Sequence, residues 1–120
     1  MSKDLEGRVA LITGATTGMG RATAIALAKR GASVVVAARR EKEGADAVRD
    51  IEAAGGQGLF LRTDVTDEAQ ARSMVDRTLE RFGRLDMAFN NAGSGVNVPI
   101  TEMTADAWHH DLAVNLTGVF

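Results

Sequence analysis

Short apolar runs alternate along this chain with longer segments in which apolar residues recur every three or four positions. Runs such as Val9-Ala10-Leu11-Ile12 and Val34-Val35-Val36 are apolar on both faces, as is typical of strands buried in a parallel sheet. We therefore predict strands at 8–13, 33–38, 59–61 and 85–89, and helices at 19–30, at about 41–54, from 66 or 67 to about 82, and after Thr104.

The order of these elements predicts an α/β fold. Strands that alternate with helices pair in parallel, and right-handed crossovers wind such a sheet in both directions from its first strand. The expected strand order is 3-2-1-4, within a single domain that covers residues 1–120. A ligand is then expected at the carboxyl ends of the strands, where the order reverses between the first strand and the fourth. Alanines 22, 24, 26 and 28 are expected to let the first helix lie close to the strands.

The junction between the first strand and the first helix carries the strongest local signal, Thr13-Gly14-Ala15-Thr16-Thr17-Gly18-Met19-Gly20. Free N–H groups and the positive end of the helix dipole would meet there and form an anion site. Gly14 would permit a tight exit from the strand, Gly18 a close approach of a diphosphate, and Gly20 close packing of the helix. The spacing is a variant of the dinucleotide fingerprint, and no Gly-Lys-Ser/Thr triplet of a P-loop follows.

Composition narrows the function classes. The 120 residues carry a net charge of −2, which gives no electrostatic basis for binding nucleic acid or an anionic membrane. There is no cysteine, so disulfides and thiolate chemistry are excluded, and a cytoplasmic location is expected. There is also no tyrosine, and the last residues, Gly118-Val119-Phe120, lie in a predicted helix without a stop signal. We therefore expect a truncated chain.

Four motifs together carry a family resemblance: the glycine-rich turn, Asp64-Val65, Asn90-Asn91-Ala92-Gly93, and Asn115 within Val114-Asn115-Leu116-Thr117-Gly118. In this order, they resemble the N-terminal half of a short-chain dehydrogenase/reductase. The resemblance implies a Rossmann-type fold, hydride transfer between nicotinamide and a carbonyl or alcohol substrate, and a homo-oligomer, either a dimer or a tetramer. It also implies coenzyme contacts from a first set of residues: Gly14, Thr16, Thr17, Gly18, Met19 and Gly20.

The residues after the second strand bear on the choice of coenzyme. An acidic residue there would accept a hydrogen bond from a ribose hydroxyl, whereas an arginine suits a 2′-phosphate. The run is Ala37-Ala38-Arg39-Arg40, with no carboxylate before Glu41. We therefore expect NADP(H) rather than NAD(H), with Arg39 as the first candidate for the phosphate and Arg40 as the second. The alternative is that both arginines are solvated or pair with Glu41 or Glu43.

The remaining motifs receive their roles from the resemblance. Asp64 and the backbone of Val65 would contact adenine, and Asn91, Ala92 and Gly93 would line the path to the nicotinamide. Asn115 would help to hold a proton-relaying water, as the one residue of a catalytic Asn-Ser-Tyr-Lys set that is present. From the residues alone, Asp64 could simply begin a turn, Asn90 to Gly93 could only brace strands, and Asn115 could have no special role.

Two readings of function remain open from the sequence. Without the serine and the Tyr-x-x-x-Lys of the family, the chain is either an inactive N-terminal part of an NADP(H)-dependent oxidoreductase or a non-catalytic dinucleotide-binding or interaction module. The resemblance also implies that the chain is truncated before a fifth strand, which would cover the fourth. Without it, the exposed edge of the fourth strand is expected to make the chain prone to self-association. His109 and His110 cannot chelate a metal together from adjacent helix positions, and Trp108 would serve packing or a subunit interface.

Overall fold

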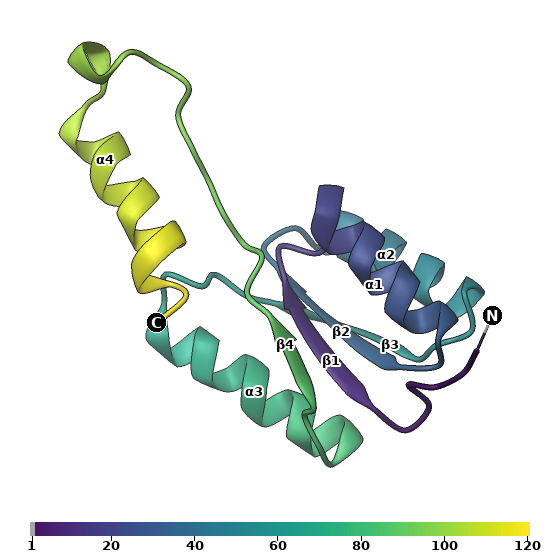
Figure 1. Ribbon diagram of the computed structural model, residues 1–120. Helices are drawn as coiled ribbons and strands as arrows, with labels where there is room; N and C mark the ends of the chain where they lie inside the picture. The colour runs from purple at the N-terminus through teal and green to yellow at the C-terminus, as the bar shows by residue number, and fades with distance from the viewer. Residues whose placement is uncertain (1) are drawn as a thin grey trace.

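The computed structural model describes residues 2–120 as a four-stranded parallel sheet with helices on both faces (Figure 1). The strands are β1 (Val9–Thr13), β2 (Ser33–Ala38), β3 (Gly58–Arg62) and β4 (Met87–Phe89). Their order is β3-β2-β1-β4, and every adjacent pair is parallel. The predicted fold class and strand order are confirmed. The switch in winding direction falls between β1 and β4, as expected for a doubly wound sheet.

The helices form two layers that cover the sheet. Helices α1 (Gly18–Lys29) and α2 (Glu41–Ala53) lie over one face, and α3 (Glu68–Phe82) lies over the other (Figure 1). The first core holds Ile12, Val34 and Val36 against α1 and α2, whereas the second holds Leu11 and Val35 against α3. Alternate residues of β1 and β2 therefore enter different cores, which explains why both strands are apolar throughout.

Helix α1 corrects one expectation from the sequence. Gly20, Ala24 and Ala28 are buried, but Ala22 and Ala26 are exposed. A spacing of four residues returns to the same helix face, while a spacing of two does not. Only every second alanine of the run therefore contacts the sheet.

Strand β4 is shorter than predicted. It begins at Met87 and not at Leu85, and its register with β1 starts at the pair Ala10 and Met87. Asp86 stands just before this register and is hydrogen-bonded to Val9 in both directions. Its amide donates to the Val9 carbonyl at 2.9 Å, and its carboxylate accepts from the Val9 amide at 2.8 Å. The entry of β4 is thus fixed by a side chain as well as by the sheet ladder.

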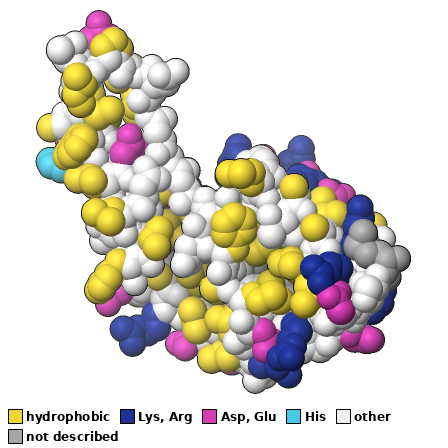
Figure 2. All heavy atoms as spheres, in the orientation of Figure 1, with side chains coloured by type: hydrophobic (Ala, Val, Ile, Leu, Met, Phe, Trp, Pro, Cys, Tyr) yellow, Lys and Arg dark blue, Asp and Glu magenta, His cyan; other side chains and the backbone are white. Residues whose placement is uncertain are grey.

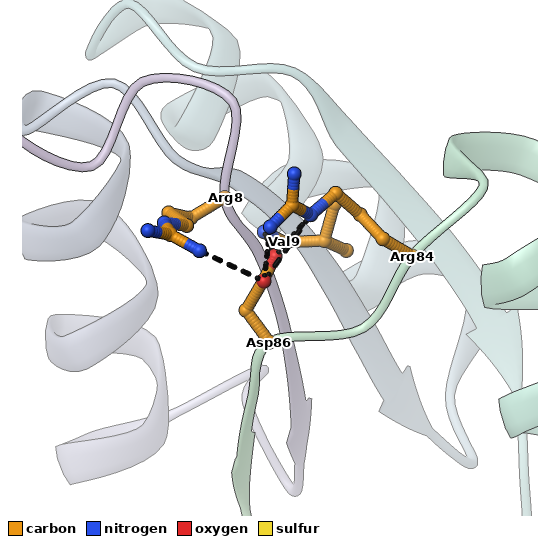
Figure 3. A network of polar contacts seen from close by, with 4 residues as sticks. All are labelled: Arg8, Val9, Arg84 and Asp86. Atoms are coloured by element: carbon orange, nitrogen blue, oxygen red, sulfur yellow. Dashed lines mark hydrogen bonds and ion pairs between the residues drawn. The ribbon is translucent and has the colours of Figure 1, made fainter.

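Arg8 and Arg84 also bind the Asp86 carboxylate (Figure 3). We call this cluster of Arg8, Val9, Arg84 and Asp86, at the amino ends of β1 and β4, the Asp86 clasp. Arg84 Nε donates to the two carboxylate oxygens of Asp86 at 3.1 and 2.9 Å, and Arg8 approaches at 3.4 Å. The Arg84 contact and the Val9 amide lower the pKa of Asp86 from 3.8 to about 2. Only the ionised carboxylate can accept all of these hydrogen bonds.

We expect the Asp86 clasp to make stability depend on pH. Because the folded pKa lies below the unfolded one, the stabilisation is complete above about pH 4 and is lost as the pH falls towards 2. Asp86→Asn should lower the Tm at neutral pH, and the difference from the wild type should shrink between pH 4 and 2. Thermal denaturation across this range measures the effect. A constant difference in Tm would show that ionisation of Asp86 is not what stabilises the clasp.

Beyond β4 the chain leaves the sheet. An extended segment leads through a short 3-10 turn, Ile100–Glu102, to α4 (Ala105–Leu112), which continues as a π-helical segment, Ala113–Thr117 (Figure 1). This projecting part carries many exposed apolar side chains (Figure 2). They include Val96, Val98, Ile100, Trp108, Leu112, Leu116, Val119 and Phe120. Among residues 2–120, no helix is long and apolar enough to cross a membrane.

Candidate functional site

A cavity of about 260 Å³ opens at the carboxyl ends of the four strands. It brings together ten of the site residues predicted from sequence: Gly14, Thr16, Thr17, Arg39, Arg40, Asp64, Val65, Asn91, Ala92 and Gly93. Ala37, Ala38, Thr63, Ser94 and Val114 complete its lining. Four predicted site residues, Gly18, Met19, Gly20 and Asn115, do not line it. The main contributors are thus the turns after all four strands.

Gly14 makes the first of these turns possible. Its φ of +65° is one that side chains rarely adopt, and its amide donates to the Ala37 carbonyl at 2.9 Å. A Cβ atom at this position would lie 2.9 Å from the Ala92 Cα. Gly14 therefore allows the turn after β1 to lie directly against the turn after β4.

Gly18 and Gly20 differ in their surroundings. Gly20 is helical, but a Cβ there would come within 2.8 Å of the Gly14 carbonyl oxygen and 3.0 Å of the Ala15 Cα. Gly18 has a φ of +59°, and a Cβ there would meet nothing within 4 Å. Gly20 therefore serves close packing of α1 on the turn, whereas the space beside Gly18 is open for a ligand.

The N-terminus of α1 has no side-chain cap. Its N-cap residue is Thr17, whose hydroxyl accepts no hydrogen bond from the first turn, and the first turn contains no acidic residue. In contrast, Asp67 caps α3 and Thr104 caps α4 with such bonds. Threonine is a preferred capping residue. Amide donors left free beside an open glycine fit a bound anion such as a diphosphate.

Thr13 joins two turns of the cavity, a role that the sequence analysis did not assign to it. Its hydroxyl accepts hydrogen bonds from the amides of Asn91, at 3.1 Å, and Ala92, at 3.0 Å. In return, the Asn91 side chain donates to the Gly14 carbonyl at 3.1 Å. The turns after β1 and β4 are thus joined by three hydrogen bonds. A polar residue at the end of an otherwise apolar strand was the available signal.

Asp64 forms a tight turn after β3. Its Oδ1 accepts hydrogen bonds from the Thr66 hydroxyl at 2.7 Å and the Thr66 amide at 2.9 Å. These donors, with smaller contributions from the charges of Arg39 and His110, lower the pKa of Asp64. Within residues 2–120, the other carboxylate oxygen has no hydrogen-bond donor. Asp64 therefore builds a turn and still offers one oxygen to a ligand.

Arg39 and Arg40 follow β2 and precede α2. Both line the cavity, and neither forms an ion pair with a carboxylate in the part of the chain that the structure describes. The alternative that they pair with Glu41 or Glu43 is therefore not what the structure shows. Two guanidinium groups without such partners make this edge of the cavity suitable for a phosphate.

Asn115 lies outside the cavity and holds one of its walls. Its Oδ1 accepts from the Ser94 amide at 2.9 Å, and its Nδ2 donates to the Ser94 carbonyl at 2.6 Å. It stands in the π-helical segment and not in regular α-helix as expected, because the Gly118 amide bonds to the Ala113 carbonyl five residues earlier. Val114, in the same segment, lines the cavity.

Asp111 is a second holding residue that sequence reasoning missed. Its carboxylate accepts from the Ser94 hydroxyl at 2.9 Å and from the Val96 amide at 3.4 Å. It precedes Asn115 by four residues, a spacing that places two helical side chains on one face. Asp111 and Asn115 thus both hold the segment after Gly93 by hydrogen bonds.

The comparisons with known proteins agree with this geometry. The model of the short chain dehydrogenase family matches residues 8–120. The chain belongs to the short-chain dehydrogenase/reductase family. Its members act on small-molecule substrates and are commonly oligomeric.

Individual relatives show how much of the family fold is present. The short-chain dehydrogenase/reductase astE of Aspergillus oryzae is 45% identical over 117 residues, which cover 96% of this chain and 45% of the relative. A dehydrogenase/reductase structure from Mycobacterium marinum aligns with a TM-score of 0.94 and 39% identity, over 98% of this chain and 48% of the other. The structure of NAD+-bound xylitol dehydrogenase aligns with a TM-score of 0.93 and 32% sequence identity. The alignment covers 97% of this chain and 45% of the other. The chain spans about half the length of the curated relatives that it matches.

Proposed function

We propose that this chain is the coenzyme-binding N-terminal part of an NADP(H)-dependent short-chain dehydrogenase/reductase. The observation that carries the proposal is the cavity at the strand ends. Its lining combines the turn that leads into the uncapped N-terminus of α1 with Arg39 and Arg40, which form no ion pair among the described residues. Two groups of anion-binding donors in one cavity lining suit a dinucleotide that bears a diphosphate and a separate 2′-phosphate.

Each wall of the cavity receives a role in this proposal. The free amides at the start of α1 hold the diphosphate, and Gly18 keeps its approach open. Arg39, with Arg40 as the second candidate, binds the 2′-phosphate. The free oxygen of Asp64 and the amide of Val65 contact adenine, while Asn91, Ala92 and Gly93 line the path to the nicotinamide. Nicotinamide supplies hydride chemistry between a carbonyl and an alcohol carbon when the coenzyme is bound.

Asn115 acts in this proposal through the Ser94 backbone. By holding both the amide and the carbonyl of Ser94, it fixes the wall beside Gly93. The sequence contains no tyrosine, the residue that serves as acid and base in the family. We therefore propose that these 120 residues bind coenzyme but do not turn over a substrate by themselves.

Association with a second copy is a further part of the proposal. Trp108 is 49% exposed and Leu116 is 66% exposed, so the packing role that the sequence offered for Trp108 within the chain is not observed. Exposed apolar side chains on one projecting helix favour a subunit interface. We propose a homo-oligomer that uses the α4 surface.

A fluorescence titration with NADPH and NADH tests the proposed coenzyme. We expect NADPH to bind about tenfold more tightly, because one additional charge-assisted phosphate contact contributes about 1.5 kcal/mol or more. Saturating NADPH should also shift the amide resonances of Gly14 to Gly20. Equal affinity, or tighter binding of NADH, would remove the argument for NADP(H). Binding of neither coenzyme to the folded chain would contradict the function as a whole.

A further inference from the structure

Arg21 connects three parts of the molecule that surround the glycine-rich turn. It lies in the first turn of α1, and its Nη1 donates to the Thr16 carbonyl at 3.1 Å. Its Nε and Nη2 donate to the Asp50 carboxylate on α2, with the Nε contact at 3.1 Å. The Arg21 side chain is 30% exposed and that of Asp50 is 46% exposed. One guanidinium thus ties the turn to both helices on this face of the sheet.

The contact with Thr16 bears directly on the direction of the amides. A peptide unit is planar and trans, so its C=O and N–H point in opposite directions. When Arg21 draws the Thr16 carbonyl towards α2, it also directs the Thr17 N–H away from α2. Thr16 and Thr17 both line the cavity. Because Thr17 has no side-chain cap to fix this turn from within, the orientation depends on an outside group.

Only an arginine can make all of these contacts. Its planar fork presents donors in two directions, whereas a lysine ammonium at this distance reaches either the carbonyl or the carboxylate well. The Asp50 carboxylate also compensates the charge of Arg21, whereas Arg39 and Arg40 in the cavity lining have no ion-pair partner among the described residues. Geometry therefore assigns Arg21 to orientation and not to direct binding of an anion.

We propose that Arg21 is a positioning residue for the coenzyme diphosphate: anchored by Asp50, it holds the peptide between Thr16 and Thr17 so that the amides of the turn are aligned before the coenzyme binds. This inference rests on the proposed function and deepens it. It implies that α2, which begins directly after Arg40, is mechanically connected to the diphosphate turn through one side chain.

Arg21→Lys tests the proposal, with Arg49→Lys as the matched control. Arg49 lies on α2 in an ion pair with Asp46 and is 71% exposed, without contact to the turn. We expect Arg21→Lys to weaken NADPH and NADH by the same factor, about five- to tenfold, because both carry the diphosphate. Arg49→Lys should leave both affinities unchanged. A loss confined to NADPH, or no loss in either titration, would overturn the inference.

A second measurement keeps the test independent of coenzyme binding. In the free protein, 15N relaxation should show greater motion of the Thr17 and Gly18 amides in Arg21→Lys and in Asp50→Asn, but not in Arg49→Lys. Unchanged order at both amides would overturn the positioning role. If the wild type binds neither coenzyme, the proposed function fails, and the relaxation data alone then decide whether Arg21 orders the turn. Thermal denaturation of each variant identifies any loss of folded protein.

Discussion

Replacement of Arg39 by alanine is expected to weaken NADPH binding by about 10- to 100-fold while changing NADH binding less than about twofold. The estimate corresponds to one charge-assisted hydrogen-bonded contact of about 1.5 to 3 kcal/mol. Arg39 lines the cavity, is free of ion pairs among the described residues, and follows the end of β2 directly. NADH lacks the phosphate that would bind there, so only one coenzyme should respond. Parallel fluorescence titrations measure the ratio of the two affinities.

Arg40→Ala and Arg49→Ala complete this experiment. Arg40 also lines the cavity and is the second candidate, so a larger loss in Arg40→Ala than in Arg39→Ala would transfer the phosphate role to Arg40. Arg49 lies on α2 away from the cavity and should have no effect. Added salt should weaken NADPH binding more than NADH binding, because solvent screens an exposed pair of charges. If NADPH and NADH lose affinity equally in Arg39→Ala, the residue does not recognise the 2′-phosphate.

Most of the architecture could be predicted from sequence because the apolar patterns and helix-ending residues of the sequence match the strands and helices that are buried or end there. The apolar runs of β1 and β2 have no polar face, which only a covered parallel strand explains, and Gly83, with a φ of +77°, ends α3 where predicted. Prediction from sequence was less accurate for the start of β4 and for the buried face of α1. Leu85 continues the apolar pattern but packs from the loop, while Asp86 adds a side-chain hydrogen bond to its backbone pairing with Val9.

The parts of the site that sequence could not supply are contacts between distant residues. Arg21 and Asp50 are 29 positions apart, and Ser94 and Asp111 are 17 apart, so no local spacing connects them. The π-helical segment was equally invisible, because its residues, Ala113 to Thr117, are acceptable in an ordinary helix. Motifs predicted ten of the residues that line the cavity. The side chains that hold the turns in place became visible only in three dimensions.

Within the glycine-rich turn, we expect a substitution that lowers NADPH affinity strongly while it lowers folding stability only slightly. Gly18→Ala should cost only about 1 kcal/mol of folding stability, since an alanine at a φ of +59° is strained but has open space around it. The same methyl group would occupy the approach of the diphosphate, and NADPH affinity should fall more than about tenfold. Gly7→Ala is the matched control, because Gly7 has a φ of +81° and equally open surroundings but lies before β1, outside the glycine-rich turn.

Gly20→Ala is expected to act in the opposite way to Gly18→Ala, with its main effect on folding stability. Its methyl group would lie 2.8 Å from the Gly14 carbonyl oxygen and 2.5 Å from the Asn91 amide nitrogen, which itself bonds to that carbonyl. Relief of this overlap requires α1 to move away from the turn, at a cost of about 1 to 3 kcal/mol. Thermal denaturation and NADPH titration of the three variants separate these effects. If Gly18→Ala binds NADPH as well as Gly7→Ala does, the open space beside Gly18 is not where the diphosphate lies, and the coenzyme site would have to be placed elsewhere.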